Sequence, residues 1–210
     1  IKNQKYIFII VGLSAALVLG YLGFDKFIQE PKQSVATNDM FQSQQYFDQA
    51  VNGASKDSLF TLALNGADGK YGFLDIADLY SGSKAGNLAN YYAGMAYLNM
   101  KDYSNAVTYL NAFSSNDDVL GPIAKGGIGD AFVQLEQLDD AYDYYVQAAQ
   151  LKSNNYTTPM YLYKAGVIGL KLGNYSSALG FFNQIKSDFS ESTEAKDIDI
   201  FIGKAEAAIN

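Results

Sequence analysis

Carboxylates are the main side chains of this 210-residue sequence that could carry out acid–base chemistry, because it contains no cysteine and no histidine. A thiolate nucleophile, a Ser-His or Cys-His pair, an imidazole-containing zinc site and a disulfide are thereby excluded. Two adjacent acidic pairs are the candidates for a general acid and base, Asp117-Asp118 and Asp139-Asp140. Both lie in predicted loops or helix starts, where an acid caps a helix or favours its dipole. We therefore expect no enzyme activity, no cofactor and no metal.

A glycine-rich segment, Gly126-Gly127-Ile128-Gly129, is the second candidate for chemistry, as a phosphate-binding loop. Such a loop follows a strand and ends in Lys followed by Ser or Thr. No strand is predicted before this segment, and no such pair follows it. We interpret its glycines as small residues within a closely packed helix.

Three segments of the chain repeat one pattern, in which a glycine precedes an alanine and a bulky apolar residue at fixed offsets. In register, the repeated positions are Gly94, Tyr97, Ala106 and Leu110; Gly129, Phe132, Ala141 and Tyr145; and Gly166, Gly169, Ala178 and Phe182. The alanines are 35 and 37 residues apart (141 − 106 and 178 − 141), close to the ~34-residue period of tetratricopeptide (TPR) helix pairs. Two antiparallel helices approach closely where a small residue of one meets a large residue of the other, so these positions predict helix crossings.

Short breaks in the helical pattern divide each repeat into two helices. They are polar or contain glycine, and they lie at residues 100–103, 136–139 and 173–175. Pro122 and Pro159 each open a repeat. We expect both at the first helical position, where the missing N–H has no intrahelical partner to lose.

The chain therefore resembles the TPR family over about half of its length, in residues 87–120, 122–156 and 159–190. The third unit departs from the family pattern at Gly169, where a large aromatic residue is preferred, and the family's Trp near each repeat start is absent. The resemblance implies an all-α fold built as a TPR-type α-solenoid that binds proteins.

The start of the chain predicts a transmembrane helix. Tyr6 to Phe24 is a run of 19 residues without a charge, and a helix of that length is about 28 Å long, close to a bilayer core of ~30 Å. Lys2 and Lys5 precede it, which favours an N-terminus in the cytoplasm. A cleaved signal peptide is the alternative, although its apolar region is usually shorter and ends in a small-x-small site.

The remaining segments are expected to extend the array at both ends. Residues 1–24 form the transmembrane segment, 25–37 a juxtamembrane linker, 38–86 a degenerate helical repeat region, 87–190 the three TPR units and 191–210 a helix that caps the array. Within the second region, residues 53–72 could form a short helix or a hairpin.

The first helices of TPR pairs line a concave groove, so the resemblance implies a protein-binding surface on them. Counting offsets from each repeat start, we expect nine groove residues: Tyr91, Met95, Leu98, Asp130, Val133, Gln134, Tyr163, Val167 and Lys171. The set is apolar and aromatic, and it predicts a groove for an apolar or extended polypeptide. Several of these residues could also pack against neighbouring helices.

The net charge argues against nucleic acid as a partner. Residues 25–210 contain 13 lysines, no arginine and 22 acidic residues, a net charge of −9 (13 − 22). Phosphate binding requires clustered cations, so nucleic acid and anionic membrane surfaces are both disfavoured.

The order of the predicted transmembrane helix and the TPR domain points to a particular TPR family. A single N-terminal span followed by an acidic TPR domain is similar to the YfgM family, ancillary subunits of the bacterial SecYEG translocon that associate with the periplasmic chaperone PpiD. The residues at 87–94 and 121–124 also resemble TPR proteins of Bacteroidota. The resemblance implies an inner-membrane protein with a periplasmic TPR domain, whose partners are SecYEG, a PpiD-like chaperone and nascent secretory polypeptides.

A cell-envelope scaffold is the alternative, similar to the YbgF/CpoB proteins of the Tol-Pal system. Those proteins carry C-terminal TPRs after a cleavable signal and a trimerising coiled coil. Residues 25–83 show no sustained heptads, which disfavours this interpretation.

Overall fold

The structure is a computed structural model, and it describes residues 4–24, 26, 30–53 and 56–209; for residues 4, 5, 7 and 30–32 only the backbone is described. The described residues form eleven α-helices and no strand, which confirms the predicted all-α class. The helices are α1 (Gln4–Phe24), α2 (Glu30–Asn52), α3 (Lys56–Asn65), α4 (Phe73–Leu79), α5 (Lys84–Asn99), α6 (Tyr103–Ala112), α7 (Leu120–Gln134), α8 (Leu138–Leu151), α9 (Thr157–Leu172), α10 (Tyr175–Asp188) and α11 (Ile198–Ile209).

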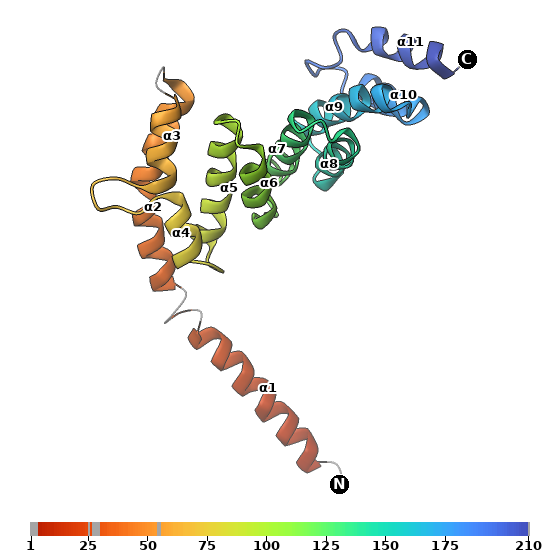
Figure 1. Ribbon diagram of the computed structural model, residues 1–210. Helices are drawn as coiled ribbons and strands as arrows, with labels where there is room; N and C mark the ends of the chain where they lie inside the picture. The colour runs from red at the N-terminus through yellow and green to blue at the C-terminus, as the bar shows by residue number, and fades with distance from the viewer. Residues whose placement is uncertain (1–3, 25, 27–29, 54–55, 210) are drawn as a thin grey trace.

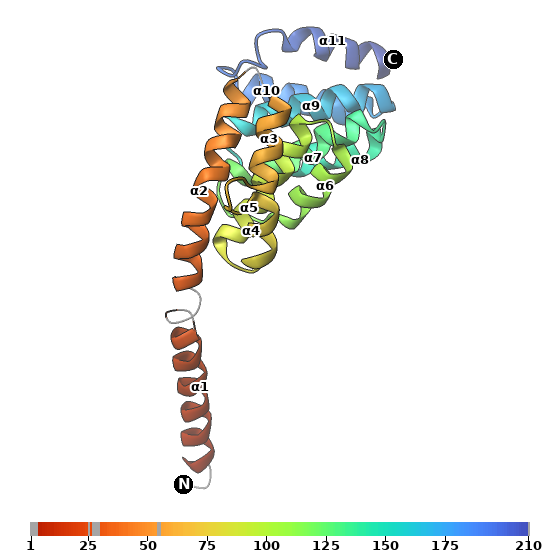
Figure 2. The same ribbon diagram turned by 60° about the vertical axis from the view of Figure 1, so that its left-hand side comes forward.

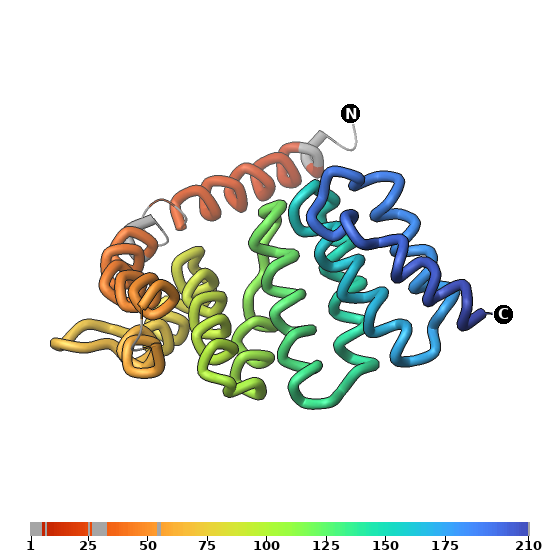
Figure 3. The backbone as a smooth tube through the Cα atoms, turned by 90° about the horizontal axis from the view of Figure 1, so that it is seen from above, coloured from red at the N-terminus to blue at the C-terminus, as the bar shows by residue number. Residues whose placement is uncertain are grey.

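Helices α5 to α10 form three consecutive pairs, α5 with α6, α7 with α8, and α9 with α10. Each helix packs on the next one along the chain, so the pairs stack into a row with α2–α4 at one end and α11 at the other (Figure 1). Seen from above, the helices from α2 to α11 follow one another in chain order (Figure 3). This is the helical repeat architecture expected from the alanine spacing.

The predicted helix crossings are confirmed in all three pairs. A methyl group added to Gly94 would lie 2.6 Å from Cγ of Leu110, and one added to Gly129 would lie 2.7 Å from the ring of Tyr145. Gly166 faces the ring of Phe182 in the same way. The second residue of each pair follows its glycine by 16 positions (110 − 94, 145 − 129 and 182 − 166), so one contact is repeated three times along the array.

The turn inside each pair is also repeated. Lys101, Glu136 and Gly173 follow the first helices and have left-handed backbones, with φ of 64°, 59° and 81°. The next residue donates its N–H to a carbonyl five residues earlier, from Asp102 to Tyr97 (2.9 Å), Gln137 to Phe132 (2.9 Å) and Asn174 to Gly169 (2.8 Å). This is the Schellman geometry that ends helices, and it reverses the chain within three residues.

Both prolines lie two positions further into their helices than expected. α7 begins at Leu120 and α9 at Thr157, so Pro122 and Pro159 occupy the third helical position. Side chains of the preceding loops start both helices earlier: Asp117 accepts the N–H of Leu120 (2.8 Å) and Asn154 accepts that of Thr157 (2.7 Å). The third position is still in the first turn, where an N–H has no intrahelical partner.

The N-terminal region is more regular than expected. Residues 30–37, assigned to a linker, are the first turns of α2, and Pro31 is tolerated there because it lies in the first turn. Residues 56–65 form the helix α3, so a hairpin within 53–72 is wrong. At the other end α11 begins at Ile198 within the predicted 191–210.

Helix α2 is held to its neighbours by polar contacts as well as by buried Ala36, Met40 and Ala50. Tyr80 donates its hydroxyl proton to Asp39 (2.6 Å), and the Ser43 hydroxyl donates to the Tyr71 carbonyl (2.9 Å). α2 is therefore part of the folded array.

Helix α1 projects away from the array in both ribbon views (Figures 1 and 2). Its described side chains are mostly exposed, and Leu17 is the most exposed of its large apolar residues at 75%. Among the described residues, no helix combines the length and the hydropathy needed to cross a membrane. The predicted span over residues 6–24 thus stays a prediction.

Candidate protein-binding groove

The first helices of the three pairs lie next to one another. α7 contacts both α5 and α9, whereas the second helices α6, α8 and α10 approach each other less closely. Long side chains connect the second helices, as in the 3.1 Å hydrogen bond that Tyr144 donates to Asn111. A row that is tighter on one side curves toward that side. We call the surface of α5, α7 and α9 that faces away from α6, α8 and α10 the inner face.

The nine predicted groove residues all lie on these three helices, three on each. Those on α5 are partly buried by packing. The ring of Tyr91 lies 5.2 Å from that of Phe113. Met95 and Leu98 line the space beside Gly127, where an added methyl group would lie 3.6 Å from Sδ of Met95 and 3.5 Å from Cδ2 of Leu98. These two residues therefore help to join α5 to α7.

Asp130 is the centre of a polar network between α7, α8 and α9. Its Oδ1 accepts the hydroxyl proton of Tyr145 at 2.6 Å and lies 2.6 Å from Nζ of Lys164. The same Nζ lies 5.4 Å and 5.7 Å from the ring centroids of Tyr145 and Tyr161, within the range of cation–π attraction. One lysine is thus held by a carboxylate and two aromatic rings.

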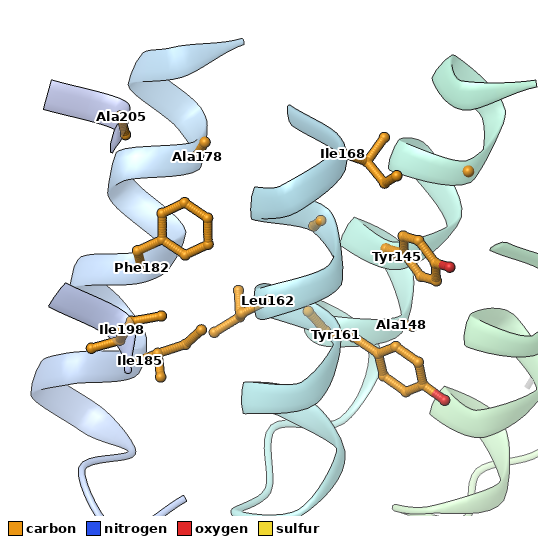
Figure 4. Packing of buried hydrophobic residues seen from close by; sticks show 13 residues of the cluster. Tyr145, Ala148, Tyr161, Leu162, Ile168, Ala178, Phe182, Ile185, Ile198 and Ala205 are labelled. Atoms are coloured by element: carbon orange, nitrogen blue, oxygen red, sulfur yellow. The ribbon is translucent and has the colours of Figure 1, made fainter. Parts of the chain in front are cut away.

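Two glycines make room for this network. The ring of Tyr161 occupies the space that a side chain at Gly126 would need, and Tyr145 occupies that of Gly129. Both rings are buried. In the close view Tyr161 points away from the helix that carries Phe182, whereas Leu162 points toward Phe182 and Ile185 (Figure 4). Burial, and then the nearby charge of Asp130, raises the pKa of Tyr145 and of Tyr161 well above the usual value. Both hydroxyls therefore stay protonated to a higher pH than that of an exposed tyrosine.

Lys164, Tyr145 and Tyr161 were not among the predicted groove residues. The sequence contains an indirect signal for Lys164: the offset between Gly129 and Gly166 (166 − 129 = 37) makes Val167 equivalent to Asp130, and Lys164 lies one helical turn before Val167. Equivalent positions of adjacent first helices lie side by side in a stacked array. Opposite charges within one turn of equivalent positions can therefore form an ion pair.

The groove residues of α9 differ in how far they are covered. Tyr163 packs against α10 and α11, with its ring 5.0 Å from that of Phe201 and 6.4 Å from that of Phe182. Val167, like Val133 of α7, is half-buried and packs against a hydrophobic core that α8 to α11 form around Leu162 and Phe182. Lys171 and Gln134 are exposed.

The acidic pairs considered for catalysis lie away from the inner face. The carboxylate of Asp117 accepts the N–H groups of Val119 and Leu120, both at 2.8 Å, and these bonds lower its pKa. Asp139 and Asp140 are exposed in the first turn of α8. Asp117, Asp139 and Asp140 thus lie where a carboxylate stabilises a helix N-terminus, as expected.

Comparison of the chain with protein-family models, with curated proteins and with solved structures found no match.

Proposed function

We propose that this chain is a membrane-anchored, TPR-type scaffold that binds extended polypeptides on its inner face. The observation that carries the proposal is the threefold repeat of the contact between a glycine and a large residue, Gly94 with Leu110, Gly129 with Tyr145, and Gly166 with Phe182. It builds a curved row of helix pairs, an architecture that typically presents an extended concave surface to a partner.

The proposed anchor is the N-terminal helix. The sequence has 19 residues without a charge from Tyr6 to Phe24. About 20 apolar residues suffice to cross a bilayer. α1 is 21 residues long and exposes large apolar side chains, among them Phe8, Leu13 and Leu17. An exposed apolar surface of this size favours a lipid or protein environment over water.

Within this role, we propose that the chain assists secreted proteins as an accessory, YfgM-like subunit of the Sec translocon in the bacterial inner membrane, together with a PpiD-like chaperone. An anchor directly followed by a peptide-binding array places that array at the membrane surface. The alternative Tol-Pal scaffold would require a coiled coil between anchor and array. The described part of residues 30–83 instead consists of α2 to α4 and their connections, with α2 packed on α3, α4 and α5.

Affinity purification from membranes solubilised in a mild detergent tests this role. We expect a tagged chain to recover the translocon channel and a PpiD-like chaperone. A variant with Leu13→Lys and Leu17→Lys, which places two charges in the proposed anchor, should recover neither. Recovery of Tol-Pal components without the channel would contradict the translocon assignment.

A further inference from the structure

Charges are unevenly distributed over the three helix pairs. The first helices α5, α7 and α9 carry a net charge of +3, from four lysines and one acidic residue (4 − 1). These residues are Lys84, Lys125, Lys164, Lys171 and Asp130. The second helices α6, α8 and α10 carry one lysine and four aspartates, a net charge of −3 (1 − 4). The first helices are thus basic in a chain whose net charge is −7.

Two of these lysines belong to the inner face. Lys164 reaches Asp130 on the neighbouring first helix, and Val167 and Lys171 follow it at the third and seventh positions. Residues with this spacing share one face of a helix. Lys125 is different, because it precedes Asp130 by five residues of α7 (130 − 125), about 140° around the helix, and so lies on another face. There its Nζ lies 5.2 Å from the ring centroid of Tyr144 of α8.

Both inner-face lysines are accessible to a partner. The side chains of Lys164 and Asp130 are 33% and 39% exposed, so their ion pair borders solvent. Lys171 is exposed and makes no ion pair within the described residues. Val167, between the two lysines, is a half-buried apolar residue. Met160, one turn before Lys164, is another.

The basic surface ends near α11. The pKa of Tyr163 is raised by burial and then by the charges of Asp197 and Glu194. Both carboxylates belong to the connection that leads into α11, whose Phe201 ring lies 5.0 Å from that of Tyr163, so negative charges follow the basic surface on its C-terminal side.

We infer that the inner face recognises an extended polypeptide segment that carries two side-chain carboxylates three residues apart with apolar residues beside them. Lys164 and Lys171 are separated by seven residues of α9, about 10.5 Å along the helix. In the polyproline II form of an extended chain, three residues complete one turn and span about 9.3 Å, so two such carboxylates lie on one face and match the two lysines. Val167 then lies beside the apolar residues between them. The inference rests on the proposed function and adds the chemistry of the partner.

Asp130 sets the affinity for such a segment. It already neutralises Lys164, so a partner carboxylate must share or displace it. An Asn at this position can still accept the Tyr145 hydroxyl proton, but it leaves the charge of Lys164 unpaired. Asp130→Asn should therefore strengthen binding of the acidic segment.

Fluorescence anisotropy with the full chain in detergent tests the inference. The probe is a fluorescein-labelled, C-terminally amidated 12-residue peptide with an Asp-x-x-Asp core between leucines and valines. Its matched control has Lys in place of both Asp residues, and empty micelles correct for binding to detergent. We expect the acidic peptide to bind about tenfold more tightly than the basic one, and less tightly as salt is added.

Matched variants locate the binding surface. Lys171→Gln should weaken the acidic peptide about threefold or more, and Asp130→Asn should tighten it, whereas Lys125→Gln on the other side of α7 should change little. Equal or tighter binding of the basic peptide would overturn the inference and leave the peptide-binding role standing. If neither peptide binds, the inference fails together with that role.

Discussion

Lys101 and Glu136 occupy the same place in successive helix pairs and share a left-handed backbone, with φ of 64° and 59°. The third pair has Gly173 at this place, with φ of 81°. A side chain in this conformation costs about 1 kcal/mol or more, a cost that glycine avoids.

Replacement of either residue by glycine should therefore stabilise the fold. We expect Lys101→Gly and Glu136→Gly each to raise the free energy of unfolding by about 0.5–1 kcal/mol, which urea denaturation can measure. Gly173→Ala is the matched reverse substitution and should lower it by a similar amount. A loss of stability in both glycine variants would contradict the repeated turn.

The glycine crossings predict which small residues are irreplaceable. Gly129→Ala should lower the free energy of unfolding by about 1–3 kcal/mol, because its methyl group would overlap the ring of Tyr145. Gly180→Ala in α10 is the control, since nothing lies within 4 Å of the added methyl group. That control should be neutral or stabilising by up to about 1 kcal/mol, as for alanine in an exposed helix. Equal effects of the two substitutions would show that the crossing is misplaced.

The hydrogen bond from Tyr80 to Asp39 predicts a pH dependence. This bond, with burial and the charge of Asp39, raises the pKa of Tyr80 from 10.0 to about 12. Because the folded pKa exceeds the unfolded one, the contribution is fully present below pH 10 and is lost as the pH rises toward 12. Spectrophotometric titration can measure this pKa. The titration curve of Tyr80→Phe, subtracted from that of the wild type, should leave one phenol that ionises near pH 12. In Asp39→Asn that ionisation should move toward 10, and an unchanged midpoint would exclude Asp39 as the cause.

The anchor can be tested independently of any partner. We expect the wild-type chain to stay in the membrane after carbonate extraction. Leu17→Lys should reduce this retention, since a charge near the middle of a span costs about 2.5–3.5 kcal/mol. Phe41→Lys is the control, because Phe41 is an exposed aromatic residue of α2 outside the apolar run. Release of the wild type by carbonate would contradict anchoring through α1.

The repeat pattern was predictable because it depends on local spacing. Gly94, Gly129 and Gly166 stand at a constant distance from Leu110, Tyr145 and Phe182, since each pair closes through a turn of nearly the same length. Spacing of this kind is visible without knowing how the pairs stack.

Contacts between pairs were less predictable. The network of Asp130, Tyr145, Tyr161 and Lys164 depends on the rotation of α7 relative to α9, which the periodicity of one helix does not determine. The start of α2 was missed because Pro31 and polar residues are typical of linkers, whereas burial of Ala36 and Met40 by neighbouring helices overrides that preference. Likewise Tyr163 is covered by Phe201 of a helix outside the repeats.

Site-specific photocrosslinking in intact membranes tests the central claim, that the inner face binds polypeptides at the membrane. The photoreactive residue p-benzoylphenylalanine would replace Val167 on the inner face and, as the matched control, the exposed Gln147 on α8. We predict crosslinks from position 167 to secretory polypeptides in transit and few or none from position 147. Equal labelling from both positions, or labelling from position 147 alone, would contradict the account.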